Sequence, residues 1–133
     1  MQESEMIKKY NPESIVGPFS QYSQGAEAPA GTRWLYIAGQ VGANPDGSIA
    51  KGAEAQVKRA WLNLIAVLES AGMGVEDLVK INTYITRPED VELNRRIRDR
   101  MLKSDGPAVT MVTVAALSHP EWLVEIEGVA AKA

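Results

Sequence analysis

The segment PAVTMVTVAALSHPEWLVEIEG, Pro107–Gly128, gives the strongest indication of the fold. It contains two runs rich in residues that favour strands, Val109–Leu117 and Leu123–Val129, separated only by the short break SHPEW. Valine and threonine dominate the first run, and such runs bounded by turn residues are typical of strands. We therefore predict two strands that follow each other in this part of the sequence.

The second run shows which way its side chains point. Val124 and Ile126 alternate with Glu125 and Glu127, and this period of two is typical of a strand with one buried face. Both carboxylates then project from the other face of the strand. They either face solvent on an exposed sheet surface or serve a function, because a buried charge is costly unless it is paired or used.

The rest of the chain reads as alternating strands and helices. Apolar residues at spacings of three and four predict helices, and period-two runs ended by Pro or Gly predict strands. The predicted elements are a strand at Met6–Tyr10, a loop at Gly17–Gly25, a strand at Trp34–Val41, a helix at Gly52–Ala71, a strand at Val79–Arg87 and a helix at Val91–Lys103. The overall order is β, β, β, α, β, α, β, β, and it predicts an α+β fold with a mixed six-stranded sheet and two helices on one face.

Two helices cover only one face of such a sheet. The other face would carry Val and Thr side chains, Tyr84 and the two carboxylates. A monomer would expose this face as a large semi-apolar patch, and association through sheet faces with closed symmetry would cover it. Binding sites would then lie at the seams between subunits.

Length and composition restrict the classes of function. The 133 residues suit a single domain, 1–133, and the absence of cysteine excludes disulfides and Cys-based metal sites. The single histidine, His119, is too few for a His-rich metal site, and the net charge of −3 disfavours nucleic acid as a partner. No apolar run is long enough to span a membrane and no signal peptide is visible, so we expect a cytoplasmic protein.

The helix predicted at Val91–Lys103 is rich in arginine. Leu93, Ile97 and Met101 form its thin apolar stripe. We expect its basic residues to form an exposed, solvated side, as most such runs do. These residues are Arg95, Arg96, Arg98, Arg100 and Lys103.

Four segments in this order resemble the Rid family, the RidA/YjgF-like reactive-intermediate deaminases. They are GPFSQYSQG, WLYIAGQVG, AWLNLIAVLESAGMGVEDLVKINTYIT and PAVTMVTVAALSHPEWLVEIEGVA. The resemblance covers nearly the whole chain. It implies a chorismate-mutase-like α+β fold and a homotrimer in which three sheets form a central barrel, with small-molecule clefts between adjacent subunits.

The resemblance also implies an activity. Founding members hydrolyse enamines and imines to a 2-keto acid and ammonia, with no metal or cofactor. An arginine in a Pro-Ala-Arg-Ser motif binds the substrate carboxylate, for which a guanidinium is well shaped. A glutamate in the last strand positions water or transfers a proton.

Several residues of this chain match the family positions. Glu125 matches the glutamate and is the candidate acid/base. Gly39 and Gln40 match the glycine at a strand end and its neighbour, and Asn94 matches a polar position that often borders the cleft.

Two family positions, the aromatic residue of the first loop and the arginine of the Pro-Ala-Arg-Ser motif, do not match this chain directly. The family has an aromatic residue in the first loop, and two residues of this chain could match it. Alignment on the Gly-Pro pair selects Phe19, whereas alignment on Tyr-Ser-Gln selects Tyr22. We favour Tyr22, because it has a hydroxyl group. Val109, followed by Thr110, stands where the family has its arginine. Both are counted among the expected substrate-binding residues, although valine cannot hold a carboxylate. The chain resembles a subgroup that lacks this arginine.

Other cations are available to replace the missing arginine. Arg33, Lys80 and Arg87 lie near strand ends, and Arg95 or Arg98 could reach a seam from the helix. The sequence does not select among them.

Two functions from different classes remain open. One is a hydrolase of an imine or enamine with Glu125 as acid/base, for which an apolar cleft would raise the pKa of the carboxyl group. The other is a non-catalytic trimeric protein that binds or senses a small metabolite. A ribonuclease activity, attached to some family members, is disfavoured because the chain is acidic and lacks paired histidines.

Overall fold

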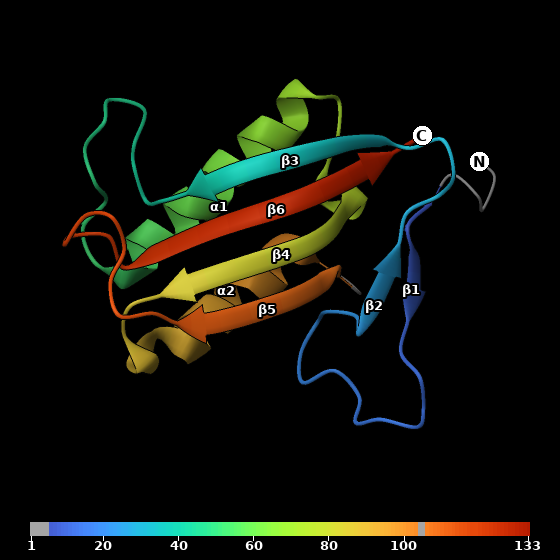
Figure 1. The fold of residues 1–133 in the computed structure, drawn as a ribbon. Helices are drawn as coiled ribbons and strands as arrows, with labels where there is room; N and C mark the ends of the chain where they lie inside the picture. Colours follow the sequence, from blue (N-terminus) through green and yellow to red (C-terminus); the bar gives the residue numbers. More distant parts are fainter. Residues whose placement is uncertain (1–5, 104–105) are drawn as a thin grey trace.

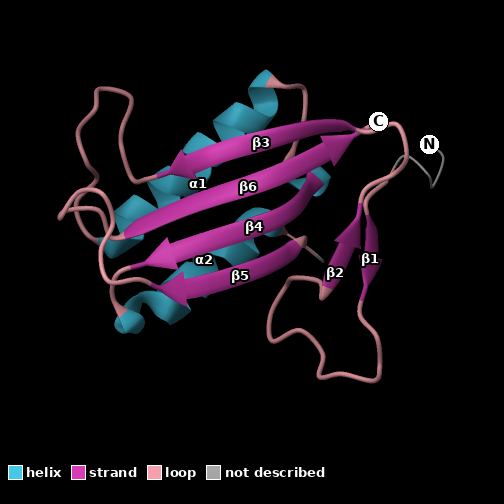
Figure 2. Ribbon diagram, in the orientation of Figure 1, coloured by secondary structure: helices cyan, strands magenta, loops and turns pink. Residues whose placement is uncertain are grey.

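The computed structural model describes residues 6–103 and 106–133, and it contains two layers (Figures 1 and 2). The strands are β1 (Lys8–Tyr10), β2 (Gly25–Glu27), β3 (Arg33–Gln40), β4 (Leu78–Ile85), β5 (Ala108–Thr113) and β6 (Val124–Lys132). The helices are α1 (Ala53–Ser70) and α2 (Val91–Leu102), with 3₁₀ turns at Val75–Asp77 and Pro88–Asp90. Both long helices pack on the same face of the larger sheet, as predicted.

The described strands form two sheets rather than the single one predicted. The larger sheet has the order β3-β6-β4-β5, in which β4 and β5 are parallel and the other neighbours antiparallel. β1 and β2 pair only with each other. Just before β2, Ser23 makes a single isolated bridge to Ala108 at the start of β5.

β5 is shorter than the run Val109–Leu117 suggests. Its partner β4 ends at Ile85, because Pro88 follows closely and begins a 3₁₀ turn. The last link between the two segments is the hydrogen bond from the Val114 N–H to the Ile85 carbonyl, at 2.7 Å. Beyond it no described strand pairs with this segment, and strand propensity alone does not extend β5.

The core lies between the larger sheet and the helices. Val124 and Ile126 of β6 are fully buried against this layer, as their alternation with glutamates predicted. The stripe on α1 is buried with them and consists of Val57, Ala60, Trp61, Leu64 and Leu68. Within the described ranges no helix is long and apolar enough to cross a membrane.

The opposite face of the four-stranded sheet is called here the open face, because no helix of the described residues covers it (Figure 1). Trp34 and Tyr36 of β3 are 53% and 76% exposed there, and Val112 of β5 is 42% exposed. The strand register places Glu125 in one row with Tyr84 and Val112 across this face. The open face is therefore a partly aromatic surface that also carries carboxylates.

Candidate functional site

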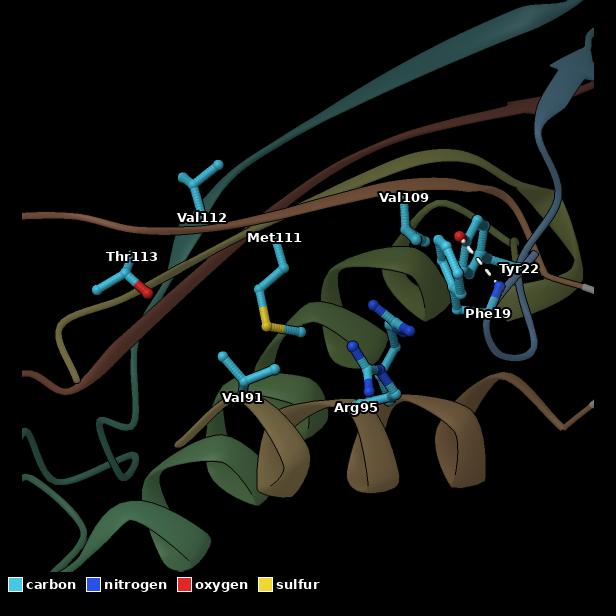
Figure 3. Close-up of a pocket in the computed structure, with 9 residues that line it drawn as sticks. Phe19, Tyr22, Val91, Arg95, Val109, Met111, Val112 and Thr113 are labelled. Carbon is cyan, nitrogen blue, oxygen red and sulfur yellow. Dashed lines mark hydrogen bonds between the residues drawn. The ribbon is translucent and has the colours of Figure 1, made fainter. Parts of the chain in front are cut away.

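A cavity of about 200 Å³ lies between β5, α2 and the loop that carries Phe19 and Tyr22 (Figure 3). It brings together residues that are far apart in the sequence. Its lining residues are Phe19, Tyr22, Val91, Arg95, Arg98, Val109, Met111, Val112 and Thr113. The parallel register of β4 and β5 places Val109 and Met111 on the helix side of the sheet, and Figure 3 shows both pointing toward α2.

Specific hydrogen bonds hold the loop over this cavity. The Ser20 hydroxyl donates to the Asp99 carboxylate on α2, and the Ser23 N–H donates to the Pro107 carbonyl at 3.0 Å. The Phe19 N–H donates to the Tyr22 hydroxyl oxygen at 3.2 Å. Because a tyrosine hydroxyl is both donor and acceptor, Tyr22 keeps its own proton available for a ligand.

Two arginines of α2 reach the cavity. Arg95 is paired with Glu92 at the surface, whereas Arg98 is only 4% exposed and its guanidinium carbon lies 5.7 Å from the centre of the Tyr22 ring. Burial lowers the pKa of Arg98, and the neighbouring Asp99 carboxylate opposes this shift. Arginine nevertheless remains protonated at neutral pH.

The expectation of an exposed basic side on α2 is therefore wrong for Arg98. The residue lies on the stripe of buried residues Asn94, Arg98 and Leu102, at a spacing of four. The folded loop with Tyr22 covers it. The spacing of four from Asn94 and Leu102 could have indicated that Arg98 is buried. The apolar residues of α2 alone do not indicate it.

A second group of predicted residues lies on the open face, around a bulge in β3. Ile37 pairs with Gly128 and Gln40 pairs with Ile126, so β3 has one more residue than β6 between these pairs. The bulge brings the Gly39 backbone against Glu125. A methyl group on Gly39 would overlap the Glu125 carboxylate and lie 2.7 Å from its Cδ and 2.9 Å from its Cγ.

The two carboxylates of β6 have different surroundings. Tyr84 donates its hydroxyl hydrogen to Glu127, and the Asn82 amide donates to the same oxygen at 3.3 Å. The bond to Glu127 raises the pKa of Tyr84, because ionisation would abolish it. Glu125 has no hydrogen-bond partner among the described residues.

Glu127 also borders a wider hollow on the open face. This hollow has a volume of about 440 Å³, and Tyr36, Lys80 and Asn82 contribute to its wall. Thr110 lies on the same face, and its hydroxyl accepts a hydrogen bond from the Lys80 ammonium at 2.8 Å.

The predicted site residues thus fall into separate groups. Phe19, Tyr22 and Val109 line the cavity, whereas Gly39 and Glu125 meet on the open face. The Gln40 side chain donates to the Ala38 carbonyl at 3.0 Å and lines neither hollow described above.

Asn94 is also placed away from both hollows. It is 2% exposed, and its amide donates to the carbonyl of Asp90, the residue before α2, at 2.9 Å.

Comparisons with known proteins agree with this architecture. The family model described as Endoribonuclease L-PSP matches residues 13–132. A RutC family protein from Aquifex aeolicus is 35% identical over 117 residues, which are 86% of this chain and 91% of that protein. The human protein named 2-iminobutanoate/2-iminopropanoate deaminase is 31% identical over 117 residues, 86% of this chain and 80% of the relative.

A solved structure extends the similarity to the fold. The Rid family protein YyfB from Yersinia pestis has a TM-score of 0.84 and 30% sequence identity, with 93% of this chain and 97% of that chain covered. The matched segments include both helices and the four-stranded sheet. The chain therefore belongs to the Endoribonuclease L-PSP family, which comprises the YjgF, RidA and RutC proteins.

Proposed function

We propose that the protein is a homotrimeric hydrolase of small imines and enamines, with Glu125 transferring a proton to or from the reacting water. The observation that carries this proposal is the environment of Glu125. Its carboxylate lies against bare backbone at Gly39 and has no hydrogen-bond partner in residues 6–103 and 106–133, whereas Glu127 is held by two donors. A carboxylate with free lone pairs is suited to acid/base work.

The substrate class follows from the named relative and from the reaction chemistry. The human relative is named for 2-iminobutanoate and 2-iminopropanoate. In such a substrate, water adds to the carbon of the C=N bond, the C–N bond then breaks, and the products are a 2-oxo acid and ammonia. No electron is gained or lost, so side chains that move protons suffice.

The proposed site is completed by a second subunit. Within one chain Glu125 is separated from β5 by β4, about 10 Å at the usual strand spacing, so it does not reach the cavity of its own chain. β5 is the edge strand of the sheet, and the cavity opens beside it. Packing of three open faces would bring Glu125 of one copy toward the cavity of a neighbour, and would cover Trp34 and Tyr36.

The first experiment is a coupled assay. An amino-acid oxidase generates a panel of 2-imino acids in situ, and their disappearance is followed with and without the protein. We expect the wild type to accelerate the loss of short-chain imino acids. Val109→Arg, which restores a cation on β5, serves as the comparison. If neither protein accelerates hydrolysis, the non-catalytic binding function replaces this proposal.

Gly39→Ala tests the position of Glu125. The added methyl group would displace the far end of a flexible side chain, so we expect at least about tenfold slower hydrolysis but little loss of stability. Rates and guanidinium unfolding curves are compared with Gly17→Ala, whose methyl group would meet no atom within 4 Å. In a protein that already carries Glu125→Gln, Gly39→Ala should not lower the hydrolysis rate further. If the two substitutions lowered the rate independently, so that their effects on the activation free energy were additive, this explanation would be contradicted.

A further inference from the structure

Arg98 is a buried cation whose hydrogen bonds are incomplete. Its Nε forms an ion pair with Asp99 Oδ1 at 3.6 Å, but neither atom has a hydrogen-bond partner within the described ranges. The other oxygen of Asp99 accepts the bond from Ser20. Buried charges are normally paired and fully hydrogen-bonded, because desolvation is otherwise uncompensated. An incompletely bonded guanidinium at a cavity wall therefore indicates a place for an anion.

The rest of the cavity restricts the kind of anion. The wall opposite α2 is apolar, with Val109 and Met111 from β5, and Val91 adds a further apolar side chain. At about 200 Å³ the cavity is smaller than the pockets of roughly 300–1,000 Å³ that hold drug-sized ligands. These dimensions suit a short molecule with one anionic end and one apolar end.

We propose that Arg98 binds the carboxylate of the substrate from α2, with Arg95 as a second positive charge and the apolar wall receiving a short alkyl chain. This inference rests on the proposed function and deepens it, since it names the cation that Val109 cannot provide. The planar guanidinium matches the two oxygens of a carboxylate. Tyr22 stacks near Arg98 and offers its hydroxyl proton to the same ligand.

The recognised class is then the short-chain aliphatic 2-imino and 2-oxo monocarboxylates. A second carboxylate or a polar chain that lies against Val91, Val109 and Met111 would lose its hydration there, because these three side chains offer no hydrogen bonds.

The experiment measures binding separately from turnover. Isothermal titration calorimetry gives the affinity of 2-oxobutanoate, a stable 2-oxo acid, and of its uncharged methyl ester. We expect the wild type to bind the acid and not the ester, and Arg98→Gln to weaken binding of the acid by at least about tenfold. Arg100→Gln is the matched control, because it removes the same charge from an exposed position of α2 and should change affinity less than twofold.

Arg98→Lys keeps the test decisive if Arg98→Gln does not fold. Lysine keeps the positive charge but lacks the planar group that donates two parallel hydrogen bonds to a carboxylate. We therefore expect the affinity of Arg98→Lys for 2-oxobutanoate to lie between those of the wild type and Arg98→Gln. In addition, the Nε–H signal of Arg98 in the NMR spectrum of the wild type should shift when 2-oxobutanoate is added. An unchanged signal, or a lysine variant as tight as the wild type, overturns the bidentate contact.

The outcomes separate the inference from the proposed function. Hydrolysis and binding that both persist in Arg98→Gln overturn the inference alone. Binding of 2-oxobutanoate that depends on Arg98, without hydrolysis of any imino acid, overturns the hydrolase and leaves the carboxylate site. Absence of both binding and hydrolysis in the wild type overturns both.

Discussion

Glu125→Gln is expected to slow imine hydrolysis by about 10²–10⁴-fold, the usual contribution of a general acid/base. Glutamine keeps the shape of the side chain and its place against Gly39 but cannot exchange a proton. Binding of 2-oxobutanoate should change little, because the proposal places the carboxylate contact at Arg98. The measurements are the hydrolysis rate in the oxidase-coupled assay and the affinity by calorimetry.

Glu127→Gln is the matched control for this prediction. It makes the same change two residues further along the same face of β6, where Tyr84 and Asn82 already hold the side chain. We expect its rate to stay within about tenfold of the wild type. If Glu125→Gln and Glu127→Gln lowered the hydrolysis rate equally, the assignment of proton transfer to Glu125 would be wrong.

Mixing two impaired variants examines whether Glu125 acts across a seam. Chains carrying Arg98→Gln and chains carrying Glu125→Gln are unfolded together and refolded as a mixture. If each site takes its cavity from one chain and its carboxylate from another, about a quarter of the seams in a random mixture regain both wild-type residues. No recovery of activity would contradict the shared site.

Trp61→Ala is expected to lower the free energy of unfolding by about 3–5 kcal/mol. Trp61 is 1% exposed at the centre of the layer between α1 and the sheet, and truncation there leaves a cavity that the packed core cannot fill. Guanidinium unfolding at a fixed protein concentration measures the loss, since the stability of an oligomer depends on concentration.

Trp122→Ala is the comparison for Trp61. Trp122 lies half-buried in the loop before β6, where its ring stacks on His119 at 5.8 Å between centroids. Its truncation removes less buried surface and should destabilise the protein by much less. If Trp122→Ala lowered the free energy of unfolding more than Trp61→Ala does, the assignment of Trp61 to the core would be wrong.

The secondary structure could be predicted from the sequence because periodicity and turn residues are local. Helix α1 and the alternation of Val124 and Ile126 with Glu125 and Glu127 agree with the prediction. The end of β5 could not be predicted, because it depends on where its partner β4 stops. The pairing of β1 and β2 with each other likewise depends on how distant segments fold together, which local patterns do not show.

The candidate site was harder to predict because its parts lie on two faces. The resemblance identified Phe19, Tyr22 and Val109, and the structure places them around one cavity. The contact between Gly39 and Glu125 depends on a bulge in β3, and strand patterns do not show where an extra residue lies. Arg98 was expected at the surface, because a charged residue is normally exposed unless the fold covers it.

The position of α2 on the face opposite the open face has an evolutionary consequence (Figure 1). If Arg98 selects the ligand and the open face holds the subunits together, residues of α2 can change ligand affinity without changing the contacts between the sheets. A lineage can then exchange residues on α2, and so adopt a new metabolite, while its quaternary structure is conserved.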